Sequence, residues 1–70
     1  MLHLGNNIKN LRQLKGKKQT DLAKILEVTQ QYISKIENSK YVSSQIIKQI
    51  AAALHVTEER IMNFDAEEIT

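Results

Sequence analysis

Residues 19–38 read QTDLAKILEVTQQYISKIEN, and this stretch carries the clearest structural pattern of the chain. Its apolar residues recur every three or four positions, as in amphipathic helices, in two short groups separated near Glu27 and Val28. Ala23 lies where the first helix would cross the second, and its small side chain lets the two backbones approach closely. The stretch therefore predicts two short helices joined by a tight turn.

The second of these helices has a polar outer face. When Ile33 and Ile36 face inward, helical periodicity places four polar residues together on the opposite side: Gln30, Gln31, Ser34 and Lys35. Their amides, hydroxyl and positive charge are the kinds of group that pair with base edges in the major groove of DNA. The face therefore predicts a helix that reads DNA. The alternative interpretation is that the glutamines are solvent-exposed helix formers.

At these residues the sequence resembles the helix-turn-helix domain of bacterial and phage repressors of the lambda repressor and Cro type. The shared pattern is QxxLAxxLxVxxxxISxxEN over residues 19–38, and flanking matches extend the resemblance to roughly residues 4–64. The resemblance implies an all-α fold, a compact five-helix bundle that forms one domain over residues 1–70, with an ordered core at about residues 4–64. It also implies a transcriptional repressor that binds a pseudo-palindromic operator in double-stranded DNA as a homodimer.

Two sets of DNA-contacting residues follow from the polar face and the resemblance. We expect base contacts at and near the start of the second helix, from Thr29, Gln30, Gln31, Ser34 and Lys35. Helix amino-termini and flanking side chains suit anions, so we expect contacts with the DNA backbone from Lys18, Gln19, Tyr32, Asn38 and Lys40. For Tyr32, packing against the domain is an equally good interpretation.

Arg12 and Glu37 match positions of the family that form a largely buried ion pair. Both break the rule that polar residues face outward, because Arg12 lies beside Leu11 and Glu37 lies beside Ile36 in the sequence. We expect this pair to orient the second helix of the motif and to make no contact with bases.

The apolar group near the end of the chain consists of Ile61, Met62 and Phe64. It exceeds what the short helix around it need bury within its own domain, so we expect these residues to form the dimer contact. The alternative is that they close the core.

Local signals mark the helix starts. Residues 5–7 offer a start for the first helix, and Thr29, Ser43 or Ser44, and Thr57 are N-cap residues for later helices. Lys17 and Lys18 stand where the family usually has a leucine followed by a capping hydroxyl, and a lysine cannot cap in that way. We expect no role for His3.

The helix ends depart from the family in three places. Gly16 follows Lys15 at the end of the first helix, where glycine is free to take positive φ. Glu27, Ser39 and His55 stand where the family commonly has glycine, and the left-handed backbone that the turn at Glu27 tends to need costs that residue strain of about 1 kcal/mol. If Ser39 does not take positive φ, Asn38 suits the end of the second motif helix. We therefore expect the fold to be kept at lowered stability.

The composition limits the function classes. A chain of 70 residues makes one domain whose small core is marginally stable, so dimerisation is the expected support. The sequence has no cysteine, and His3 and His55 are far apart, so we expect no metal or other cofactor. No apolar run approaches the ~20 residues of a membrane span, and no basic-then-apolar leader is present. We therefore expect a cytoplasmic protein without a membrane partner.

The charge is unevenly distributed along the chain. Residues 1–48 contain nine Lys and Arg residues against three acidic residues, whereas residues 49–70 contain one Arg against five acidic residues. A basic front with an acidic tail fits a module that presents its first four helices to a polyanion. The alternative interpretation is an ordinary solvated set of lysines.

The sequence leaves four other interpretations to compare with a DNA-binding regulator. An enzyme is disfavoured because the carboxylates are scattered and the sequence has no cysteine and no catalytic histidine pair. The five-helix pattern disfavours a membrane-surface peptide. The main alternative is an antitoxin-like member of the same family that neutralises a toxin partner and autoregulates its operon. The chain could also be the amino-terminal domain of a longer regulator, because similar domains end in a stretch like residues 63–65 and then continue.

Overall fold

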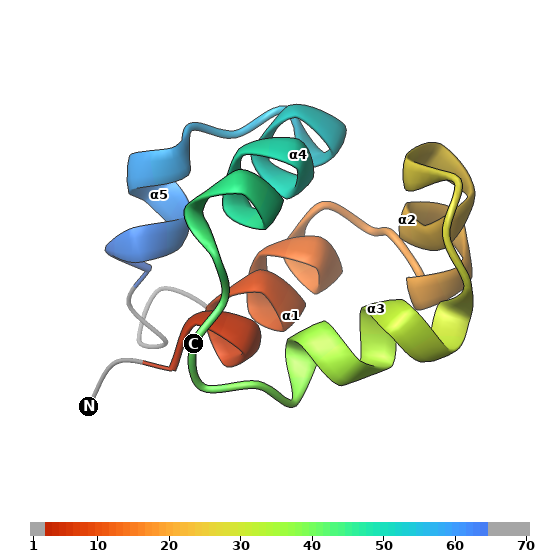
Figure 1. Cartoon of the computed structure of the whole chain (residues 1–70). Helices are drawn as coiled ribbons and strands as arrows, with labels where there is room; N and C mark the ends of the chain where they lie inside the picture. Colours follow the sequence, from red (N-terminus) through yellow and green to blue (C-terminus); the bar gives the residue numbers. More distant parts are fainter. Residues whose placement is uncertain (1–2, 65–70) are drawn as a thin grey trace.

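The computed structural model describes residues 3–64, and within that range it contains five helices and no strand. The helices are α1 (Leu4–Leu14), α2 (Gln19–Leu26), α3 (Gln30–Glu37), α4 (Ser44–Leu54) and α5 (Glu58–Met62). Helix α1 lies between α3 on one side and α4 with α5 on the other, and α2 packs against both α3 and α4 (Figure 1). The prediction of an all-α, five-helix fold is confirmed.

Every helix contributes a completely buried side chain to the core. These residues are Ile8, Leu22, Ile33, Ile50 and Ile61, each of which has no exposed surface. Each belongs to the periodic apolar pattern of its helix, so the pattern that predicts the helices also predicts their inward faces. Burying a side chain of this size contributes roughly 1.5–3 kcal/mol through the hydrophobic effect.

Hydroxyl N-caps begin three of the helices, as the sequence predicts. The side chains of Thr29, Ser43 and Thr57 each accept a hydrogen bond from the backbone N–H three residues further on. At the start of α2, where Lys18 has no acceptor to offer, the carboxylate of Asp21 instead accepts from the Lys18 backbone N–H at 2.8 Å.

The expectation that His3 has no role is wrong. Its Nδ1 accepts a hydrogen bond from the backbone N–H of Asn6 at 2.9 Å and so caps α1, which begins at Leu4. An imidazole nitrogen is an acceptor when it carries no proton. Histidine is an uncommon N-cap, so the sequence pattern gives no hint of this role.

Two non-glycine residues close helices in the left-handed backbone conformation, as expected. Glu27 ends α2 and His55 ends α4, each with a φ of 58°. Gly16, with a φ of 70°, follows α1 in the same conformation. The backbone N–H groups of Glu27 and His55 still donate to carbonyl oxygens of the preceding turn, so both helix ends are closed by hydrogen bonds.

The end of α3 does not follow this pattern, so the expectation for Ser39 is wrong. Asn38 is the C-cap with a φ of −93°, and Ser39 does not have positive φ. Side chains close this end instead. Asn38 Nδ2 donates to the Ser34 carbonyl oxygen at 2.9 Å, and the Ser39 hydroxyl donates to the Lys35 carbonyl oxygen at 2.7 Å.

Strain at the two left-handed residues gives a testable prediction. Replacing Glu27 or His55 with glycine is expected to raise the free energy of unfolding by about 1 kcal/mol each, because glycine adopts this backbone conformation without a Cβ clash. Urea unfolding measures the change. Gln13→Gly, at an exposed position inside α1, is the matched control and should lower stability by up to about 1 kcal/mol. Equal losses for all three variants would show that the left-handed residues are not strained.

Helix α5 folds back onto α1 and α4, and this corrects the predicted dimer contact. Ile61 is 0% exposed and Phe64 is 8% exposed, so both lie in the chain's own core. The Asn7 amide, also buried, donates to the Ile61 carbonyl oxygen at 2.9 Å and ties α5 to α1. The assignment of Ile61 and Phe64 to the dimer contact is therefore wrong, whereas Met62, at 42% exposure, keeps an apolar surface.

Candidate nucleic-acid interface

Helices α2 and α3 hold the polar side chains of the candidate interface. Leu22 and Ala23 of α2 and Ile33 and Ile36 of α3 are buried, which leaves the opposite face of α3 at the surface. On that face four side chains lie at the surface or partly so: Gln30, Gln31, Ser34 and Lys35. The structure therefore brings the predicted base-contacting residues of α3 together on one helix face.

The amino-terminal ends of α2 and α3 form a polar hollow. It has a volume of about 270 Å³ and is lined by Gln19, Gln30, Gln31 and Ser34. Three of these four side chains end in an amide, which carries donor and acceptor atoms side by side. A hollow of this chemistry can take a polar edge that itself offers both a donor and an acceptor.

A chain of hydrogen bonds runs from the interior to this hollow. Arg12 Nε donates to Glu37 Oε2 at 2.6 Å, and Arg12 Nη2 donates to Glu37 Oε1 at 3.1 Å. Gln19 Nε2 donates to the same Oε1 at 3.0 Å, and Gln30 Nε2 donates to Gln19 Oε1 at 3.3 Å. The buried ion pair and the exposed amide of Gln30 thus belong to one network.

The ion pair of Arg12 and Glu37 is present and lies in the interior. Arg12 is 6% exposed and Glu37 is 3% exposed. A third N–H of the guanidinium is also used within the fold, since Arg12 Nη1 donates to the Lys17 carbonyl oxygen at 2.8 Å. Two well-aligned charge-assisted hydrogen bonds, with further hydrogen-bonding partners, are what a buried pair needs to offset desolvation.

The residues expected at the DNA backbone have different surroundings. Lys18 and Lys40 are exposed, and Lys40 Nζ lies 5.6 Å from the centre of the Tyr41 ring. Asn38 is exposed but its amide donates within α3, and Gln19 is half-buried between Glu37 and Gln30. Thr29, expected at a base, caps α3 with its hydroxyl oxygen, which leaves the hydroxyl hydrogen to donate.

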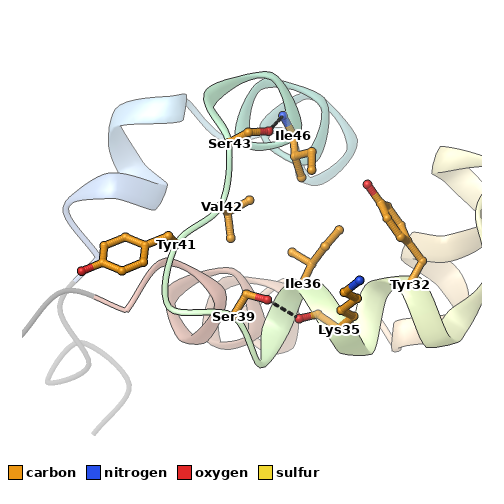
Figure 2. A pocket seen from close by; sticks show the side chains of 8 residues that line it. All are labelled: Tyr32, Lys35, Ile36, Ser39, Tyr41, Val42, Ser43 and Ile46. Atoms are coloured by element: carbon orange, nitrogen blue, oxygen red, sulfur yellow. Dashed lines mark hydrogen bonds between the residues drawn. The ribbon is translucent and has the colours of Figure 1, made fainter.

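A second groove lies beside the polar face, between α3 and the start of α4 (Figure 2). Its volume is about 240 Å³, and its lining residues are Tyr32, Lys35, Ile36, Ser39, Tyr41, Val42, Ser43 and Ile46. In Figure 2 Tyr32 and Ile36 approach from the α3 side, whereas Val42 and Ile46 approach from the other side. Tyr32 is 40% exposed, so its ring both packs in this groove and reaches the surface.

The groove differs chemically from the polar hollow at the start of α2 and α3. Its floor is apolar, and the hydroxyls of Ser39 and Ser43 are used inside the fold, by the Lys35 carbonyl oxygen and the Ile46 N–H. The charged atom at its rim is Lys35 Nζ. The groove therefore offers an apolar wall next to one positive charge.

Residues 3–64 contain no group of three or more His, Cys, Asp or Glu side chains that could hold a metal ion. Within the same residues, no helix has the length and apolar character needed to cross a bilayer.

The sequence pattern does not show the hydrogen bonds that join Gln19 to Glu37 and Gln30. These pairs are separated by 18 and 11 residues, so their contact depends on how α2 and α3 cross. The one signal available is that Gln19 opens the shared sequence pattern and Glu37 lies near its end. That signal marks the positions without showing that their side chains meet.

Comparison with known proteins places this geometry in a family. The helix-turn-helix family model matches residues 8–61. The fold is similar to the restriction-modification controller protein C.AhdI from Aeromonas hydrophila, with a TM-score of 0.75 and 26% identity over 86% of this chain and 92% of that chain. It is also similar to the hypothetical transcription factor NHTF from Neisseria, with a TM-score of 0.78 and 26% identity over 97% of this chain and 79% of that chain.

Among curated proteins, none matches the sequence. The family model, however, spans α2, the turn and α3 together with most of α1, all of α4 and the first residues of α5. One of the similar structures is named a controller protein and the other a hypothetical transcription factor. The chain therefore belongs to the helix-turn-helix family of DNA-binding transcription regulators.

Proposed function

We propose that the chain is a sequence-specific repressor that binds a pseudo-palindromic operator as a homodimer in the cytoplasm. The observation that carries the proposal is the polar face of α3, which borders a hollow lined by Gln19, Gln30, Gln31 and Ser34. Amide side chains at the start of a recognition helix can pair with adenine N6 and N7 in the major groove. C.AhdI, which has a similar fold, is described as a restriction-modification controller protein, and this supports a regulatory role.

The proposed interface has two layers, one that contacts bases and one that contacts the DNA backbone. Gln30, Gln31, Ser34 and Lys35 read base edges, with Thr29 at the rim of the same face. Lys18, Tyr32, Asn38 and Lys40, together with the amino-terminus of α2 at Gln19, hold the DNA backbone. Base contacts supply sequence preference, whereas backbone contacts supply affinity and register.

Selection of bound sites from a random DNA pool is the experiment that tests this function. A two-fold dimer places its recognition helices ~34 Å apart, so the selected sites should contain two inverted half-sites about one helical turn apart. A pool that remains random after selection would overturn the proposal of sequence-specific binding. Single half-sites in the selected DNA would overturn the dimer on a palindrome.

Mutations in the two layers should have different effects on DNA binding. Gln30→Ala or Gln31→Ala is expected to weaken operator binding by roughly 1–3 kcal/mol, relax the preference at one base pair and leave non-specific binding nearly unchanged. Lys40→Ala should weaken binding to all sequences alike and reduce the salt slope by about one unit. Titrations of operator and scrambled DNA at several salt concentrations measure both effects.

Lys9→Ala is the matched control for charge in this experiment, because it removes one exposed lysine from α1 and lies outside the proposed interface. Its salt slope should stay near that of the wild type. Equal losses on operator and scrambled DNA for both glutamine variants would refute their assignment as base readers.

Met62 provides the test of the dimer contact. Met62→Glu is expected to give a folded monomer that binds a complete operator more weakly, because a charge replaces the apolar surface that α5 leaves exposed. Sedimentation and circular dichroism measure assembly and folding. Leu14→Glu is the matched control, since Leu14 is 49% exposed on α1 and should leave the dimer intact. A stable Met62→Glu dimer would remove Met62 from the interface.

A further inference from the structure

The groove between α3 and the start of α4 has a single charged residue in its lining, and that residue is a lysine. Its eight lining residues include Lys35 and contain no Asp or Glu. The one carboxylate of α3, that of Glu37, is buried and paired with Arg12, so it is not available to Lys35. The groove therefore combines an uncompensated positive charge with apolar surface.

Two polar groups at this groove have no partner within the fold. The hydrogen bonds of Tyr32 and Lys35 to residues outside the helix ladder involve their backbone atoms, since the Tyr32 N–H donates to Thr29 and the Lys35 carbonyl oxygen accepts from Ser39. Among residues 3–64, neither Lys35 Nζ nor the Tyr32 hydroxyl has a hydrogen-bonding or ion-pair partner. An ammonium and a phenolic hydroxyl can both donate to a carboxylate.

The rest of the groove is apolar and has the size of a small ring. Ile36 is buried, whereas Val42 and Ile46 are partly buried and pack against the core. In Figure 2 Ile36 lies opposite Ile46, with Val42 beside them, and Tyr32 and Lys35 extend from α3 toward the same space. A protein cavity of about 150 Å³ holds a benzene molecule. The groove, at about 240 Å³, therefore has room for a ring with one small polar group.

We infer that this groove binds a small organic carboxylate with an apolar body about as large as a benzene ring, and that this ligand competes with DNA. The apolar body packs against Ile36, Val42 and Ile46, and the carboxylate accepts hydrogen bonds from Lys35 Nζ and the Tyr32 hydroxyl. Pockets for drug-sized molecules are larger, at roughly 300–1,000 Å³, so a larger ligand would extend out of the groove.

Competition with DNA follows from the two residues that hold the carboxylate. Lys35 belongs to the proposed base contacts, and Tyr32 belongs to the proposed backbone contacts. A carboxylate bound to both would neutralise the charge of Lys35 and occupy the donors that DNA needs. Binding of the ligand does not depend on the proposed function, whereas its competition with DNA rests on it.

The binding of benzoate and of benzyl alcohol to the full chain provides the test, because the two probes share a ring and differ in charge. Titrations are followed by the methyl signals of Ile36, Val42 and Ile46 in nuclear magnetic resonance spectra. Both probes are expected to shift these signals. At low salt benzoate should bind about fivefold more tightly than benzyl alcohol, and added salt should reduce this ratio.

Lys35→Met is the variant that isolates the charge, because methionine keeps most of the apolar stem and removes the ammonium. The preference for benzoate over benzyl alcohol should fall to about twofold or less in this variant. Lys24→Met is the matched control, since Lys24 is an exposed lysine of α2 outside the groove, and it should keep the wild-type preference. Circular dichroism checks the folding of both variants.

The effect on DNA is measured with the same probe. At a benzoate concentration ten times its Kd, the apparent Kd for operator DNA should rise about tenfold, as expected for competing ligands. Sodium chloride at equal ionic strength is the control for salt. An operator Kd that benzoate leaves unchanged would overturn the competition between the ligand and DNA.

Two further results would overturn the carboxylate site itself. One is equal affinity for benzoate and benzyl alcohol, or a preference for benzoate that Lys35→Met retains. The other is a change of the same methyl signals with protein concentration in the absence of probe, which would mean that a second copy of the chain covers the groove. If the wild-type protein binds no DNA, the proposed function fails, whereas the benzoate titration still decides whether the groove binds a carboxylate.

Discussion

Arg12→Ala is expected to lower the free energy of unfolding by about 3 kcal/mol, because it leaves the partner of a buried ion pair without its counter-charge. Glu37 would keep the Gln19 amide as a donor but lose both bonds from the guanidinium. The Lys17 carbonyl oxygen would lose its bond from Arg12 as well. An uncompensated carboxylate in the interior is the dominant cost.

This loss is large for a chain of 70 residues. Domains of this length have a total stability of roughly 4–10 kcal/mol, so the variant should unfold at least about 12 °C below the wild type. Urea and thermal unfolding, followed by circular dichroism, measure both quantities. A wild-type melting temperature for Arg12→Ala would show that the pair contributes no stability.

The double variant Arg12→Met, Glu37→Leu is the control for charge against packing. Replacing a buried ion pair with apolar side chains of similar volume is often neutral or stabilising, so most of the lost stability should return. A double variant that stays as unstable as Arg12→Ala would show that lost packing and not the unpaired charge is the dominant cost.

The sequence predicts those parts of the fold that depend on neighbours within a few positions. Helix periodicity predicts the inward faces, and Thr29, Ser43 and Thr57 are caps whose partners lie three residues away. The left-handed backbone at Glu27 and His55 is predicted through the family resemblance, because both residues stand where the family commonly has glycine. The polar face of α3 follows from the periodicity that buries Ile33 and Ile36.

Features that depend on the crossing of distant helices are the ones that the sequence misses. Asn7 and Ile61 are separated by 54 residues, and no local pattern shows that an asparagine on α1 will bond the backbone of α5. Burial of Ile61 and Phe64 is missed because a five-residue helix gives no measure of how much surface its neighbours cover. The ion pair of Arg12 and Glu37 is predicted only through the family resemblance, since 25 residues separate the two.

Gly5 is the clearest of these missed features, because its importance lies in a contact with α3. The sequence marks Gly5 as part of a helix start. In the structure the backbone N–H groups of Leu4 and Gly5 donate to the carbonyl oxygens of Lys40 and Ser39, at 2.9 and 3.0 Å, so the start of α1 lies directly against the end of α3. A Cβ on Gly5 would collide with the carbonyl oxygens of Ile36, Glu37 and Ser39.

Gly5→Ala is therefore expected to lower the free energy of unfolding by about 3 kcal/mol, near the upper end of the usual cost of overpacking, because the obstructing atoms are backbone and cannot rotate away. Helix propensity alone predicts the opposite sign, since alanine is favoured over glycine inside a helix by about 1 kcal/mol. Asn6→Ala is the matched control on the exposed side of α1 and should be neutral or slightly stabilising. Urea unfolding of both variants decides between the two effects. A Gly5→Ala protein that is more stable than the wild type would mean that α1 and α3 can separate at little cost. The ion pair of Arg12 and Glu37, which joins the same two helices, would then be the stronger of their links.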